Sequence, residues 1–243
     1  MAKILVILPQ TDFDPTEVAL PWQVWTQAGH DVCFATETGK PATCDPITLG
    51  GDRLPLLASS LKARPEAQAA YAAMIEAPEY KRPLTWAKAR AADYAALHFP
   101  GGHAPGMKSY CESPEVYRLA KEAFAAKQLV SAMCHGVLPL ARAGVLKGRR
   151  TTALTHIMEE ISVRLTASAL PGHYRTYDQR GRRGAPADQA GRPVRARGVV
   201  PALFGVKSTR GWVRAARWAL LIGSLARRCL DFGRAAERTA LIA

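Results

Sequence analysis

A strand, a helix and a second strand are predicted within the first 37 residues, and this arrangement restricts the fold most. Residues 3–9 (KILVILP) form a short apolar run bounded by proline and polar residues, as in a buried strand. Residues 14–17 (DPTE) combine a capping Asp, a first-turn proline and an acidic residue three positions after the cap. We expect a helix from there to Gly29, offset or kinked at Pro21. A strand over 31–37 then completes a βαβ unit, which implies a parallel sheet.

Strands and helices continue to alternate beyond this unit. The expected strands cover 95–100 and 129–134, with weaker ones at 151–154 and 163–167, and the expected helices cover 113–127 and 137–143. Segment 38–92, with a helical stretch at 65–77, is interpreted as an insertion or cap between sheet strands.

Cys134 lies where a buried strand runs directly into a helix, in the sequence AMCHG. This pattern predicts a nucleophile elbow, a sharp and strained turn that lifts one side chain above the edge of the sheet. The small residues Ala132 and Gly136 leave room for the turn, and the following helix points its N-terminus at the sulfur, which favours the thiolate. The amide of His135 faces the same space and is placed to donate to an oxyanion.

Other chemistry-bearing residues follow strands that end at the same rim. Gly101 and Gly102 come directly after a strand and can present backbone amides, and Glu17 follows the first strand. Each residue also has an ordinary interpretation: a small core cysteine for Cys134, a capping-box carboxylate for Glu17, a simple turn for the glycines, and a satisfied polar residue for His135. Their shared position favours a functional site.

Several motifs together resemble those of the DJ-1/PfpI superfamily, also called class I glutamine-amidotransferase-like. They are KILVILP, EVALPW, AGHDV, FPGGH (99–103), SPEV and SAMCHG (131–136), and their order and spacing match over residues 3–178. The helical segment before FPGGH is most similar to the heat-shock-chaperone/glyoxalase III branch. The resemblance implies a flavodoxin-like three-layer α/β/α sandwich with a mainly parallel sheet, usually in a homodimer.

The resemblance also implies roles for individual residues. Cys134 matches the nucleophile, Glu17 the carboxyl group that hydrogen-bonds it, and His135 the adjacent histidine of the Cys-His pair. Glu159 matches an acidic partner after the elbow, with Glu160 as the alternative. The loop residues that match the oxyanion and substrate-binding side are Gly101, Gly102 and His103, with the amides of Gly102 and His135 facing the oxyanion.

The activities implied by the resemblance leave alternatives open. We expect a cofactor-independent cysteine enzyme acting on a small carbonyl compound, such as the conversion of methylglyoxal to lactate by a glyoxalase III. A cysteine amidase or peptidase, and a redox-sensing chaperone without turnover, are the other interpretations. We expect no cofactor and no metal, because the histidines and cysteines show neither H-x-x-x-H nor C-x-x-C spacing.

The last third of the chain differs from the rest in charge. Residues 171–243 hold 15 of the 33 Lys and Arg residues but 4 of the 20 Asp and Glu residues. We therefore expect an α/β domain over 1–178 and an Arg-rich tail over 179–243, which includes a possible basic amphipathic helix at 211–238. Three interpretations of the tail stay open: an interaction segment, a divergent end of the fold, and out-of-frame translation of a GC-rich gene.

Composition limits the compartment and the partners. The five cysteines show no paired spacing, so they do not indicate a disulfide framework. The apolar segment at the start is too short for a signal peptide. We therefore expect a cytoplasmic protein. No apolar run reaches the length of a membrane span. Binding of nucleic acid or an anionic membrane by the basic tail is the less favoured partner interpretation.

Overall fold

Parallel strands form the central sheet of the computed structural model, which describes residues 1–50, 62–149, 151 and 164. Within these residues the sheet has five strands in the order β5-β3-β1-β6-β7, and every neighbouring pair is parallel. The strands, in that order, are Leu84–Thr85, Asp31–Thr36, Lys3–Ile7, Ala96–Phe99 and Leu129–Ala132. The predicted α/β class and parallel sheet are confirmed.

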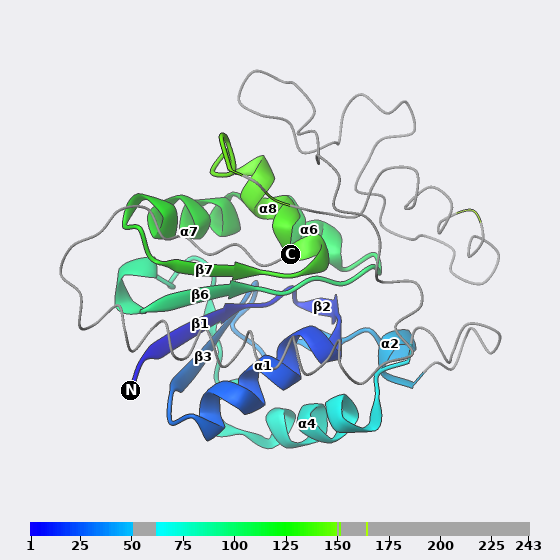
Figure 1. Ribbon diagram of the computed structural model, residues 1–243. Helices are drawn as coiled ribbons and strands as arrows, with labels where there is room; N and C mark the ends of the chain where they lie inside the picture. Colours follow the sequence, from blue (N-terminus) through cyan, green and yellow to red (C-terminus); the bar gives the residue numbers. More distant parts are fainter. Residues whose placement is uncertain (51–61, 150, 152–163, 165–243) are drawn as a thin grey trace.

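Helices cover both faces of this sheet, which gives the three-layer sandwich (Figure 1). Helices α1 (Pro15–Gln27) and α4 (Pro65–Glu76) lie on one face, and α7 (Pro114–Ala125) and α8 (Val137–Arg142) lie on the other. Strand β1 serves both layers because successive side chains of a strand point to opposite faces. Ile4 and Val6 belong to the core under α1 and α4, whereas Leu5 and Ile7 belong to the core under α7 and α8.

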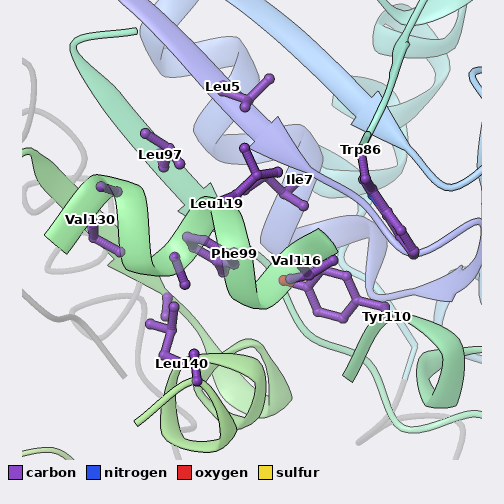
Figure 2. Packing of buried hydrophobic residues seen from close by; sticks show 14 of the residues in the cluster. Leu5, Ile7, Trp86, Leu97, Phe99, Tyr110, Val116, Leu119, Val130 and Leu140 are labelled. Atoms are coloured by element: carbon purple, nitrogen blue, oxygen red, sulfur yellow. The ribbon is translucent and has the colours of Figure 1, made fainter. Parts of the chain in front are cut away.

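The core on the α7 side joins the strands β1, β3, β6 and β7 to helices on that face of the sheet. Figure 2 shows Val116 and Leu119 of α7 in one cluster with Ile7, Leu97 and Phe99 of the sheet. Leu119 and Phe99 are fully buried. Helix α7 begins as the sequence predicts, because the Ser113 side chain caps it by accepting a hydrogen bond from the Val116 amide at 3.3 Å.

Segment 38–92 contributes to the sandwich itself. Its helix α4 packs against α1, and its strand β5 forms the edge of the sheet next to β3. A small second sheet, which the sequence did not indicate, pairs β2 (Thr11–Phe13) with β4 (Thr43–Cys44) in parallel. Among the described residues, the other short helices are α2 (Pro46–Gly50), α5 (Pro78–Lys81) and α6 (Met107–Cys111), with 3₁₀ turns at Ala91–Asp93 and Cys134–Gly136.

Several predictions fall on residues that the structure does not describe. The basic tail over 179–243, with its helix at 211–238, Glu159 and Glu160 lie outside the described residues. Thr151 is not in a strand and Arg164 is helical, so the strands predicted over 151–154 and 163–167 are wrong at these two positions. Short apolar runs do not separate strand from helix by periodicity, which explains the error. Among the described residues, no helix is long and apolar enough to cross a membrane.

We predict that Leu119→Ala lowers the free energy of unfolding by about 2–5 kcal/mol, since it removes buried methyl groups and leaves a cavity between α7 and the sheet. Urea denaturation measures this change. The control is Lys121→Ala on the exposed face of α7, which should change stability by less than about 0.5 kcal/mol. Equal losses in the two variants would contradict this packing.

Candidate active site

The predicted elbow at Cys134 is present between β7 and α8. Strand β7 ends at Ala132, and Cys134 opens the 3₁₀ turn that leads into α8. The φ angle of Cys134 is +49°, in the left-handed region that residues with a Cβ rarely adopt. Such a conformation costs on the order of 1–3 kcal/mol and persists only where the surroundings impose it.

Two glycines let the loop after β6 interlock with this turn. A Cβ on Gly101 would lie 2.6 Å from the His135 amide nitrogen and 2.9 Å from Cys134 Cβ. A Cβ on Gly136 would collide with the Phe99 carbonyl oxygen. Both contacts are closer than a side chain permits, so the backbones of the two loops approach one another only because these positions are glycine.

Glu17 reaches the same place from the first turn of α1. Asp14 caps the helix as predicted, accepting from the Thr16 and Glu17 amides at 2.8 and 3.4 Å. The Glu17 carboxylate does not turn back to complete a capping box. Its Oε2 accepts a hydrogen bond from the Gly101 amide at 2.7 Å, and the Asp14 amide donates one to the Gly101 carbonyl at 2.9 Å. The Gly101 peptide therefore holds Glu17 at the rim of the sheet.

A second contact fixes the backbone of Glu17. Pro21 lies inside α1, which continues through it, and has no N–H to donate to the Glu17 carbonyl four residues earlier. His98 on β6 takes that place, with Nε2 at 3.0 Å from the Glu17 oxygen. Because a carbonyl only accepts, Nε2 carries the proton, and Nδ1 accepts from the Ser131 hydroxyl at 3.1 Å. The proline thus creates the acceptor that joins α1 to the sheet.

The surroundings favour the uncharged form of the Glu17 carboxyl group. Burial raises its pKa well above the usual range, and the negative charges of Cys134 and Asp14 raise it further. The Gly101 hydrogen bond and His103 act in the opposite direction. Burial also raises the pKa of Asp14, against the capping hydrogen bonds that lower it. A carboxyl group perturbed by burial and a thiol is typical of functional sites.

Two imidazoles lie beside the Cys134 sulfur. His103 Nε2 and His135 Nδ1 are each 3.5 Å from Sγ. The two rings meet edge to face, with centroids 4.6 Å apart. His135 is buried, whereas Cys134 and His103 are partly exposed.

The structure brings most of the predicted site residues together. Cys134, His135, His103, Gly101 and Glu17 meet at the carboxyl ends of β6 and β7. The Gly101 amide is already hydrogen-bonded to Glu17, so it is not directed at a substrate.

Two other predicted site residues are not part of this cluster. Gly102 packs against the Asp12 carbonyl and Met107, and Glu159 lies outside the described residues.

Sequence reasoning missed His98. Pro21 is the sequence feature that could have indicated it: a proline has no N–H, so the Glu17 carbonyl four residues earlier must accept its hydrogen bond from outside the helix. It also missed that His103, Cys134 and His135 place three metal-ligating atoms together, because they come from two separate loops.

This fold and site define an open parallel α/β protein with a cysteine on a strained strand-to-helix turn. The chain belongs to the ThiJ/PfpI family: the family model described as ThiJ/PfpI family-like matches residues 8–189, more than half of the chain. The match extends past residue 178, where the sequence pattern placed the end of the domain.

Individual relatives are distant. An uncharacterised protein of Schizosaccharomyces pombe is 26% identical over 183 residues, which cover 72% of this chain and 67% of that protein. A deglycase of Pyrococcus horikoshii is 33% identical over 78 residues, covering 32% of this chain and 46% of the deglycase. A deglycase of Pyrococcus abyssi is 36% identical over 69 residues, which cover 28% of this chain and 40% of that deglycase. The chain thus spans less than half the length of either deglycase.

Solved structures support the fold. One crystal structure superimposes with a TM-score of 0.53 at 20% identity, covering 70% of this chain and 74% of the other. The Rapid Encystment Protein of Francisella tularensis gives a TM-score of 0.50 at 14% identity, covering 71% of this chain and 78% of the other. At these identities the likeness concerns the fold alone.

We predict that His98 makes stability depend on acid pH. Burial lowers its folded pKa to about 4, below the value near 6.5 of an unfolded histidine. The unfolded chain therefore binds more protons between these values, and stability is lost as the pH falls from about 6.5 to about 4. Relative to His98→Gln, wild type should lose roughly 3 kcal/mol over this window in urea denaturation. A pH-independent difference would contradict this role.

We also predict an order of cysteine modification in protein kept in chelator. Iodoacetamide should modify Cys134 before Cys33, because burial raises the pKa of Cys33, although both are partly exposed. Cys44 and Cys111 are buried and should react only on unfolding. Peptide mass mapping over time gives the order. Modification of Cys33 or Cys111 as fast as Cys134 would show that the elbow does not present its sulfur.

Proposed function

We propose that this chain is a cofactor-independent cysteine enzyme that acts on small reactive carbonyl compounds, in the manner of a glyoxalase III that converts methylglyoxal to lactate. The observation that carries the proposal is the thiol of partly exposed Cys134 on a strained turn, with two imidazoles at 3.5 Å and a carboxyl group of raised pKa at the same rim. Membership of the ThiJ/PfpI family and similarity to proteins named deglycases support the carbonyl class.

The first step of the proposed reaction is addition of sulfur to the aldehyde. The Cys134 thiolate bonds to the aldehyde carbon, the C=O π bond breaks, and the oxygen takes a proton, which gives a hemithioacetal. The amides of Gly102 and His135 are the proposed donors to the developing oxyanion. His103, in contact with the sulfur, keeps it oriented toward the substrate.

The second step moves a proton between the two substrate carbons. A base removes the C1 hydrogen to form an enediol, and reprotonation at C2 gives the thioester of a 2-hydroxy acid. Water then hydrolyses the thioester and releases the acid and the thiol, so the net reaction adds one water and needs no oxidant. Glu17 and His135 are the groups proposed to carry the proton, and Glu159 is the proposed acidic partner.

We predict that the full chain makes lactate from methylglyoxal without glutathione and that Cys134→Ala abolishes the reaction. Glu17→Gln should lower kcat by roughly 10²–10⁴-fold, the usual contribution of acid–base catalysis. In D₂O the lactate should carry deuterium at C2, because the C1 proton passes through an exchangeable group. Proton NMR measures both the product and its labelling.

The matched control is Cys33→Ser, a partly exposed cysteine outside the site, which should retain activity. Equal turnover by wild type and Cys134→Ala would contradict the proposal. Turnover without deuterium at C2 would contradict the proton-transfer step while leaving the nucleophile in place.

A further inference from the structure

Three metal-ligating atoms from two loops converge beside the rim of the sheet. They belong to His103 in the loop after β6 and to Cys134 and His135 in the elbow, and they all lie within 4.8 Å of one another. His103 Nε2 and His135 Nδ1 are each 3.5 Å from Cys134 Sγ. No spacing rule in the sequence indicates this cluster, since adjacent residues supply two of its members.

The separations suit a tetrahedral metal. With Zn–S of about 2.3 Å and Zn–N of about 2.0–2.1 Å, the tetrahedral angle sets the sulfur-to-nitrogen distance at about 3.6 Å. Both observed sulfur-to-nitrogen distances are within about 0.1 Å of that value. The two nitrogen atoms would have to lie about 3.3 Å apart around a tetrahedral ion. They lie within 4.8 Å of one another here, so metal binding draws the imidazole rings together while both sulfur–nitrogen distances are kept.

One of the ligands compensates part of a cation's charge. The Cys134 thiol binds a metal as the thiolate, so it neutralises one of the two positive charges of a divalent ion. The carboxyl groups of Asp14, Glu17 and Asp45 each interact electrostatically with His103, so they lie near the cluster. The interlocked backbones at Gly101 and Gly136 hold the two loops in register.

The ligand types select the metal. Thiolate and imidazole bind borderline-soft ions such as Zn²⁺ in preference to Mg²⁺ or Ca²⁺, which take oxygen ligands. Three protein ligands with a fourth position for water are the arrangement of open zinc sites. Cys134 and His103 are partly exposed, which gives the ion a route to the ligands.

We propose that His103 Nε2, Cys134 Sγ and His135 Nδ1 form a three-ligand site for a borderline-soft divalent metal ion of the Zn²⁺ class. On binding, the cysteine thiol releases its proton to solvent, both imidazoles bind through neutral nitrogen atoms, and no electron is transferred. The Cys134 sulfur is bonded to the metal, so bound Zn²⁺ protects Cys134 from electrophiles. The site does not depend on the proposed carbonyl chemistry.

The test uses the metal-free full chain titrated with Co²⁺, then with Zn²⁺ as competitor. We expect one equivalent of Co²⁺ to produce a near-ultraviolet thiolate-to-cobalt band, which Zn²⁺ abolishes. Cys134→Ala should lose the band. His103→Ala and His135→Ala should each weaken metal binding at least about 10–100-fold. Loss of a residue that only hydrogen-bonds a metal ligand costs this much, and loss of the ligand itself should cost no less. Zn²⁺ should slow iodoacetamide labelling of Cys134 but not of Cys33.

The controls separate this site from other thiols and from misfolding. Cys33→Ser should bind Co²⁺ like wild type, and circular dichroism should show that each variant keeps the native fold. Persistence of the band in folded Cys134→Ala, or unchanged affinity in both histidine variants, would overturn the proposal. Because the readout is spectroscopic, metal binding by a chain that does not convert methylglyoxal would support this site while contradicting the proposed function.

Discussion

Contacts made by the Gly101 peptide bring the parts of the site together. Its amide donates to the Glu17 carboxylate, its carbonyl accepts from Asp14, and its bare Cα packs against the turn at Cys134. The first helix and the elbow are far apart in sequence, yet each is fixed against this peptide. A side chain at position 101 would separate the two loops, and the thiol and carboxyl group would no longer share one rim.

The position of Glu17 also depends on a defect in α1. Pro21 removes a hydrogen bond that a regular helix would give to the Glu17 carbonyl, and buried His98 replaces it from the neighbouring strand. A helix-breaking residue therefore increases the connection between helix and sheet. Burial lowers the pKa of His98 to about 4 and so favours the neutral imidazole, although the hydrogen bond to the Glu17 carbonyl acts in the opposite direction. In this neutral ring one nitrogen donates to the carbonyl while the other accepts from Ser131.

Much of the described fold could be predicted from local pattern, and the finer contacts could not. The apolar runs at β1, β3, β6 and β7, the cap at Ser113 and the elbow at Cys134 follow from short-range sequence signals. The capping motif suggested that Glu17 closes a local box, but Gly101, 84 residues away in sequence, competes successfully for its carboxylate. The meeting of His103 with Cys134 and the bond from His98 to Glu17 likewise depend on tertiary packing, which propensity and spacing do not encode.

The Glu17 carboxyl group has a raised pKa and lies within electrostatic reach of the elbow sulfur. Infrared difference spectroscopy of the carboxylic C=O stretch, assigned with Glu17→Gln, follows the titration of this group directly. We expect a midpoint well above the value of about 4.3 for an unperturbed glutamate, and a lower midpoint in Cys134→Ala, where the sulfur charge is removed. A midpoint near the ordinary value, or one that does not respond to loss of the sulfur, would contradict this expectation.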